Sequence, residues 1–431
     1  MNTFLIAVLF AAAAPWNLKE CTDYALEHNI SVKQSALAVE QKKVDLNTAE
    51  GRRLPGVQGM VGENLSFGRG LTSDNTYSNN NTTSTSFSLG ADVPVFQGFD
   101  IKRGIQLGRL DLEAATVDLE KARDDVRIAV AKAYVQILFN DEMRRVAGNQ
   151  VSVDSLQLER LRAMQAAGKA SAADVSAQRA TLAQSRLSAV QADNNLRLAV
   201  LDLTQLLELG SPEGFAVACP SDDKFEIGLL PNPEQIFAEA VEVKPQILAD
   251  SLRLEYAGLN IRRAKGAFLP SLSVSGGLGT DYYSSGGVAG PTFGDQMRRN
   301  FSQYVRMNLT IPIFNRFSTR NSVRSAEINY NDQVLRMENT RKSLYKEIQQ
   351  AYYNAVASQA KYASSRDAAE SARQSFDLTR EKYENGKSGI TEYNEAKNRW
   401  MEAESNFLQA RYECLYQTGL LDFYRGKELD F

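Results

Sequence analysis

The chain of 431 residues lacks the features on which most enzymes and nucleic-acid-binding proteins depend. It has one histidine, His28, which we interpret as a surface or helix-packing residue, and it has no phosphate-binding glycine loop, metal-ligand spacing or plausible catalytic triad. The formal net charge of −3 offers no basic field to a nucleic acid. We therefore expect no enzyme, no nucleic-acid partner, no cofactor and no metal.

Cysteine and long apolar runs are also scarce. Cys21, Cys219 and Cys414 cannot all pair within one chain, so we interpret them as structural residues, with a Cys21–Cys414 bridge as an open alternative. Beyond the N-terminus, no segment offers the ~20 apolar residues of a transmembrane helix. Residues 1–14 hold an apolar run that ends in alanines and resembles a secretory signal peptide, so we expect an exported protein.

The sequence contains an internal duplication. Pro94–Phe99 reappears as Pro312–Phe317, 218 positions later, and Gly168-Lys169 meets Gly386-Lys387 at the same offset. A repeat of this length predicts two similar structural halves. We place the first repeat at 15–209, an irregular proline-containing connector at 210–232, and the second repeat at 233–431.

Each half is expected to contain two strands and a long helical hairpin. Alternation of apolar and polar residues predicts strands at ~57–69, ~83–97, ~270–283 and ~301–314, with polar or glycine-rich loops between the members of each pair. Helices of ~16–50 and ~233–266 precede the strand pairs.

A heptad seam begins at Ile101, steps by four and three residues, and continues toward Leu161 without a proline. About 60 helical residues form a rod of roughly 90 Å, which few globular domains can use. Tips near 166–171 and 385–390 then reverse the chain into return helices. Composition agrees with this prediction, because alanine partly replaces larger aliphatic residues, which suits narrow helical seams.

Four amphipathic strands cannot stand alone, because their edges would be unpaired and their apolar faces wet. In a bilayer they require a closed barrel, which in known single-chain examples has at least eight strands, so the chain must oligomerise if it spans one. The helices are too polar for lipid and must project into water. A barrel continued by helical rods forms a conduit.

The residues now resemble a known family, the TolC-like outer-membrane efflux proteins. The resemblance lies in the opening Trp16–Cys21, in the duplicated Leu-Pro pairs at 54 and 269, in the Pro-x-Phe strand ends at 94 and 312, and in the two Gly-Lys turns. It implies an α+β membrane protein: a homotrimer with a 12-stranded transmembrane β-barrel, four strands per chain, continued by a periplasmic α-helical coiled-coil barrel. It also implies outer-membrane lipid, a periplasmic adaptor and an inner-membrane pump as partners.

The resemblance assigns gate residues to the second tip. Glu392 and Glu395 lie three apart on a helix, hence on one face, and match the family's pore constriction. The alternative interpretation is that both glutamates lie on a solvated helix face and have no special role. Tyr383 matches the family's gate tyrosine and Asp174 the acid that it bonds, although an aromatic beside a turn is usually a packing residue.

The second tip also departs from the family. Ser388 stands where the family has arginine, and the neighbouring Lys387 cannot reproduce a bidentate arginine contact. The tips themselves, Gly168-Lys169 and Gly386-Lys387, are expected to dock the adaptor, or to be plain turns.

Two questions stay open at this point. Phe96, Phe99, Phe314 and Phe317 would either belt the membrane interface or pack the strand-to-helix joint. The expected function is passive efflux of small molecules through an iris-like gate. The alternatives are an outlet for type I protein secretion and, in a different class, a secreted helical structural protein without a channel.

Overall fold

The computed structural model describes residues 15–71, 75–79, 81–219, 228–286 and 290–429, so the expected signal peptide at 1–14 lies outside the described residues. The chain divides into two compact units. The helical unit comprises Met1–Ala38, Thr116–Ala249 and Glu338–Phe431, and the sheet unit comprises Val39–Ala115 and Asp250–Met337.

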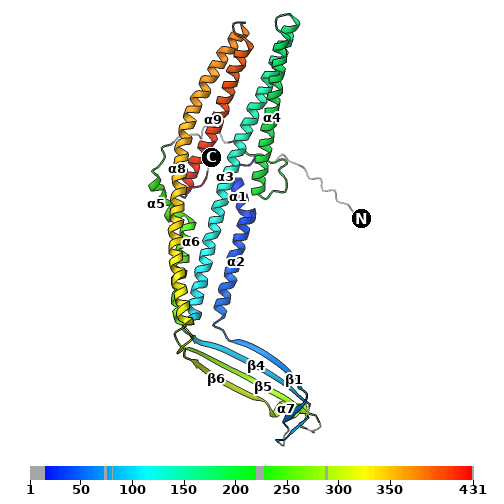
Figure 1. Cartoon of the computed structure of the whole chain (residues 1–431), viewed down its shortest axis with the longest axis vertical. Coiled ribbons are helices and arrows are strands. Elements are labelled where there is room, and N and C mark those ends of the chain that lie inside the picture. Colours follow the sequence, from blue (N-terminus) through cyan, green and yellow to red (C-terminus); the bar gives the residue numbers. More distant parts are fainter. Residues whose placement is uncertain (1–14, 72–74, 80, 220–227, 287–289, 430–431) are drawn as a thin grey trace, which may run out of the picture. The chain divides into compact units, whose positions relative to one another are not determined.

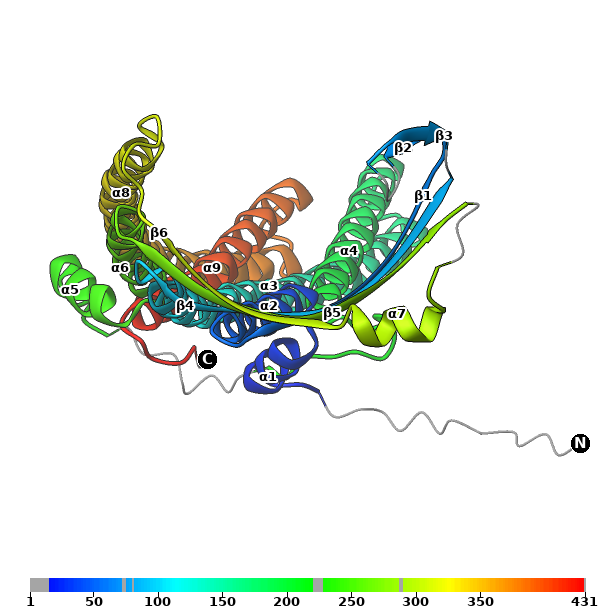
Figure 2. The same ribbon diagram turned by 90° about the horizontal axis from the view of Figure 1, so that it is seen from below.

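The sheet unit is built on four antiparallel strands, β1 (Gly56–Ser66), β4 (Thr82–Gln97), β5 (Ser271–Ser285) and β6 (Ser302–Thr310) (Figure 1). Their order is β1-β4-β5-β6, so β1 and β6 are its edges. The pairing runs from Gly56 opposite Asp92 to Ser271 opposite Thr310, with a bulge at Pro94–Phe96, where proline cannot donate to the ladder. The sheet is curved rather than flat (Figure 2).

Apolar side chains on this sheet are exposed within the single chain. Val61 on β1 is 70% exposed and Val305 on β6 is 85% exposed. Among the residues that the structure describes, every position of β6 is exposed. Such a surface is stable only when something other than water covers it.

Strand boundaries differ from the predictions in two places. β1 ends at Ser66, short of residue 69, and β6 ends at Thr310, short of residue 314. Pro312 explains the second difference, since it has no N–H for the ladder. Phe96 packs edge-to-face on Phe99 at 5.2 Å between ring centroids, and Phe314 packs on Phe317 at 5.5 Å, so each pair makes a contact at its strand-to-helix joint. Phe99, Phe314 and Phe317 are also exposed, so these contacts leave the membrane-interface alternative open.

The connections between strands contain structure that the sequence did not indicate. The short strands β2 (Arg69–Leu71) and β3 (Tyr77–Asn79) pair with each other. The predicted glycine-rich loop contains the helix α7 (Phe293–Arg299). The amide of buried Gln296 holds α7 in place, because it bonds both backbone polar groups of Tyr283 at 2.9 Å.

The two helices expected before the strand pairs are each broken once. Asn29 separates α1 (Leu18–His28) from α2 (Ile30–Gly51), and Lys244 separates α5 (Pro233–Val243) from α6 (Pro245–Gly266). The second break follows from Pro245, which disfavours helical geometry in the residue before it. At the first, the Asn29 side chain donates to the Leu206 carbonyl at 2.9 Å.

The described part of the chain has four long helices: α3 (Asp100–Ala166), α4 (Ala172–Leu206), α8 (Ser318–Glu384) and α9 (Ile390–Tyr424) (Figure 1). The helical unit contains α4, α9 and the parts of α3 and α8 from residues 116 and 338 onward. α3 and α8 each have 67 residues, and α4 and α9 each have 35. Their apolar seams form narrow buried clusters, one around Val130, Leu138 and Leu203, and another around Leu344 and Ile348.

Trp16 and the described part of the connector, up to residue 219, are bound to this unit. Trp16 pairs with the connector through bonds to Ala216 and Ala218, and the Tyr134 hydroxyl donates to the Ala218 carbonyl at 2.5 Å. All three cysteines are free: Cys21 and Cys414 are buried, whereas Cys219 is exposed. The open alternative of a Cys21–Cys414 bridge is therefore not realised, and Cys219 is no packing residue.

Candidate functional site

The two hairpin tips share one turn geometry. Gly168 and Gly386 have φ of 71° and 72°, in the left-handed region that glycine adopts without strain. At the second tip, Gly386 N–H donates to the Tyr383 carbonyl at 3.0 Å and Lys387 N–H to the Lys382 carbonyl at 2.8 Å. The first tip has the equivalent pair of bonds, so both helices end in the same motif.

The helices that leave the tips begin differently. Ser171 caps α4 and exchanges side-chain bonds with Asp174, whose carboxylate accepts from the Ser171 hydroxyl at 2.7 Å. These bonds lower the pKa of Asp174. At α9 the cap residue is Gly389, which offers no side-chain bond. The first tip is therefore fixed by a capping box and the second is not.

Tyr383 links the two hairpins. Its hydroxyl accepts from Gln157 Nε2 on α3 at 2.7 Å, and its ring lies 5.0 Å from the Tyr393 ring. The structure thus pairs Tyr383 with Gln157, in place of the expected Asp174. Burial raises the pKa of Tyr383, against the lowering effects of Gln157 and Arg160. Arg160 also lies over the ring, 5.7 Å from its centroid, and reaches Glu384 at 3.7 Å.

Glu392 and Glu395 are both exposed on the first turns of α9. Glu392 accepts from the Ser388 hydroxyl at 2.6 Å, so Ser388 supports this carboxylate where the family has an arginine. Glu395 lies 3.6 Å from Arg399, an ion-pair partner one helical turn further along α9. The docking candidates Lys169 and Lys387 are exposed, and neither has an ion pair in the described part of the chain.

A buried ionic cluster lies further along the hairpins. Lys397 on α9 contacts Asp154 on α3, and the two side chains are 1% and 0% exposed. Asp154 also accepts from Ser185 on α4 at 2.5 Å and from Gln150 at 2.7 Å. Three helices from both hairpins therefore meet at one carboxylate. The sequence held a signal for it: Asp154 interrupts the seam Val151, Leu158, Leu161 at the 3-4-3 spacing.

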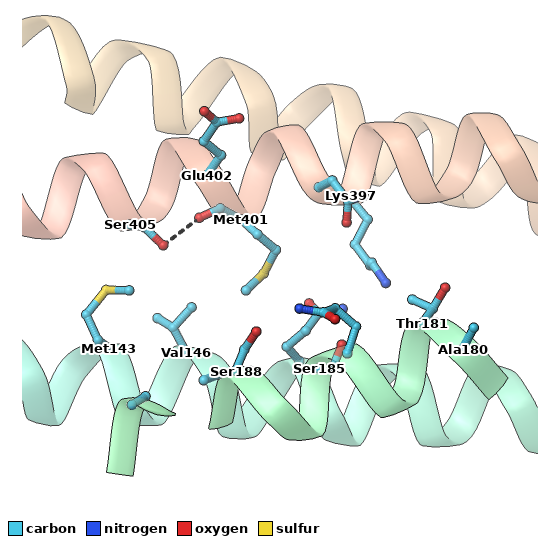
Figure 3. A pocket seen from close by; sticks show the side chains of 15 residues that line it. Met143, Val146, Ala180, Thr181, Ser185, Ser188, Lys397, Met401, Glu402 and Ser405 are labelled. Atoms are coloured by element: carbon cyan, nitrogen blue, oxygen red, sulfur yellow. Dashed lines mark hydrogen bonds between the residues drawn. The ribbon is translucent and has the colours of Figure 1, made fainter. Parts of the chain in front are cut away.

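A cavity of about 620 Å³ opens beside this cluster (Figure 3). Met143 and Val146 face it from α3, Ser188 from α4, and Lys397 and Met401 from α9. Nearby, Asn394 Oδ1 and Trp400 Nε1 are buried without a hydrogen-bond partner among the described residues. Polar contacts at Asp154 and an apolar cluster of Leu158, Leu161 and Val175, on which Ile390 of α9 packs, thus both join α9 to the first hairpin.

Other chemistry is not evident in the described residues. Within these ranges no group of three or more His, Cys, Asp or Glu side chains could hold a metal ion. The same residues contain no helix that is both long and apolar enough to cross a membrane.

Comparison with known proteins identifies the class of the molecule. The profile of the family "Outer membrane efflux protein" matches residues 22–208 and 237–421. The chain belongs to this family, whose TolC-like members are efflux channels. It is accordingly an outer-membrane protein of a Gram-negative bacterium, with its helical part in the periplasm.

Two curated relatives span nearly the whole chain. Outer membrane protein OprJ of Pseudomonas aeruginosa is 25% identical over 95% of this chain and 83% of the relative. Outer membrane protein TolC of Escherichia coli is 24% identical over 93% and 80%, respectively. A crystal structure of a membrane protein from Pseudomonas aeruginosa shares the fold, with a TM-score of 0.79 at 21% identity, over 95% of this chain and 92% of that one.

Proposed function

We propose that the protein is a homotrimeric exit channel of a tripartite efflux system, through which small molecules leave the periplasm passively. The sheet carries this proposal: its apolar residues are exposed and its edge strands β1 and β6 are open. In lipid, every backbone polar group must be paired within the protein. Pairing β6 of one copy with β1 of the next satisfies both edges, and three copies give a barrel of 12 strands.

The gate is proposed at the second tip. α9 begins without a side-chain cap, the Tyr383–Gln157 bond ties α8 to α3, and a cavity adjoins α9. In a trimer, Glu392 and Glu395 would form a ring of six carboxylates that attracts cations. Opening then consists of an outward movement of α8 and α9 once the Tyr383 contact is broken, while the capped first hairpin stays in place.

The proposed mechanism contains no energy source of its own, so the channel requires partners. We propose that an inner-membrane pump supplies the driving force and that a periplasmic adaptor docks on the exposed tips, Gly168-Lys169 and Gly386-Lys387. The matched lengths of α3 with α8 and of α4 with α9 support an internal duplication, and hence six similar tips in a trimer.

The test is single-channel recording of the full-length protein in planar lipid bilayers. Replacing both acids, E392S/E395S, should reduce cation selectivity and weaken block by divalent cations, because the ring loses its negative charge. The matched control is E370S/E381S, which removes two exposed carboxylates of α8. Unchanged selectivity and block in E392S/E395S, or equal effects in the control, would contradict the assignment of the constriction.

A further inference from the structure

A groove of about 480 Å³ lies where β4 leads into α3, entirely within the sheet unit. Three cations line it: Arg53, Lys102 and Arg109. Most of the other lining residues are apolar and include Val95, Phe99 and Ile105. A lining that combines cations with apolar side chains fits an amphiphile with an anionic head and a hydrocarbon chain.

The groove belongs to a wider basic zone at one end of the sheet. β4 ends and β5 begins at the paired residues Gln97 and Ser271, and β6 ends at Thr310 opposite Ser271. The chain segments that adjoin this end are 50–53, 100–109, 262–265 and 316–324. They hold eleven Lys or Arg residues and two acids, whereas the whole chain has a net charge of −3.

Internal ion pairs neutralise only part of this charge. Asp100 pairs with Arg263 at 2.7 Å and with Arg52 at 3.2 Å, and Glu50 pairs with Arg109 at 3.4 Å. Five exposed cations have no ion pair in the part of the chain that the structure describes: Arg53, Lys102, Lys265, Arg316 and Arg320. This excess is open to anions from outside the chain.

We propose that the groove binds an anionic phospholipid of the membrane leaflet that borders the helical part. Arg53 and Lys102 contact the headgroup phosphate, and an acyl chain lies on Val95 and Phe99. Charge complementarity favours binding of the anionic headgroup, since each Lys or Arg near an anionic bilayer surface strengthens binding. The position of Val95 favours binding of the acyl chain. Val95 is 57% exposed and belongs to β4, a strand of the sheet proposed to face lipid. A free inorganic anion would use the three cations and leave the apolar lining residues uncovered.

The test is native mass spectrometry of the full-length protein in non-ionic detergent, titrated with dioleoyl phosphatidylglycerol or dioleoyl phosphatidylcholine. The wild type should bind phosphatidylglycerol more tightly. R53Q/K102Q should weaken that binding on the order of 30-fold, since each cation contributes roughly fivefold. E50Q should tighten it severalfold, because Arg109 is freed from Glu50.

A matched control separates this site from general loss of charge. K132Q/R186Q removes two exposed cations of the helical unit and should leave phosphatidylglycerol binding unchanged. Equal binding of the two lipids by the wild type, an equal loss in the control, or full competition by millimolar inorganic phosphate would each overturn the proposal. The inference rests on the proposed placement of the sheet in lipid and not on the gate, so it survives if the gate assignment fails.

Discussion

Lys397 Nζ contacts Asp154 Oδ1 inside the helical unit, where both side chains are almost fully enclosed. The contact joins residues 243 positions apart and connects the second hairpin to the first. Burying two charges costs desolvation, which only good geometry and further hydrogen bonds repay. Ser185 and Gln150 supply those bonds, so the carboxylate is well satisfied.

Breaking this pair should destabilise the protein strongly. K397M leaves Asp154 charged and buried, so we expect a loss of about 3–5 kcal/mol in the free energy of unfolding. The measurement is denaturation of the detergent-solubilised protein followed by circular dichroism. The double variant D154L/K397M should recover much of the loss, because no unpaired charge remains. Additive losses in the double variant would show that the two residues do not act as a pair.

The Tyr383–Gln157 bond should hold the second hairpin in its described position. Y383F removes the acceptor and should lower the coupling between α8 and α3 by about 0.5–1.5 kcal/mol, the typical net contribution of one hydrogen bond. In planar bilayers, the fraction of time in the high-conductance state should then rise. Q157L should have the same effect, and adding it to Y383F should change little further.

Y353F is a suitable control for this experiment, since Tyr353 lies on the same helix and is 65% exposed. It should leave the conductance unaltered. If Y383F and Q157L open the channel independently and additively, the hydrogen bond is not the contact that holds the gate.

The sequence predicted the helices well because their signals are local, but it did not predict the long-range contacts between side chains. The bounds of α3, 100–166, agree with the heptad seam that begins at Ile101 and with the Gly168 turn, because both features are encoded within a few residues. The breaks at Asn29 and Lys244 were missed, since the apolar spacing continues across them. Family likeness pointed to Tyr383, but its partner Gln157 is 226 residues away, at a position that depends on how two helices align.

The turn glycines should be sensitive to substitution for a reason of backbone conformation alone. A Cβ at Gly386 or Gly168 would meet nothing within 4 Å, so steric contacts with neighbours are absent. Their positive φ still penalises an L side chain, and G386A or G168A should each lower the free energy of unfolding by about 1–2 kcal/mol. G148A is the control, because Gly148 lies inside α3 with the same open space. It should raise stability by about 0.5–1 kcal/mol, since alanine favours helix. A destabilised G148A would mean that the open space is not available.

A second buried cation should make stability depend on pH. Lys244 is 8% exposed, lies 3.4 Å from Asp124, and has its ammonium 3.7 Å from the centroid of the Phe423 ring. Burial lowers its pKa from the usual 10.5, although Asp124 acts in the opposite direction. Between that lowered pKa and 10.5, the folded lysine is neutral while the unfolded one still binds a proton.

The unfolded state therefore binds more protons in this window, and stability from this group rises with pH. We expect the free energy of unfolding of the wild type, minus that of K244M, to increase as pH is raised from 7 to 10.5. Subtracting the variant removes the titration of groups common to both proteins. K346M, which replaces an exposed lysine of α8, should give a flat difference. A difference that falls with pH for K244M would mean that Asp124 and the aromatic ring outweigh burial, and that the ammonium stabilises the joint between α5 and α6.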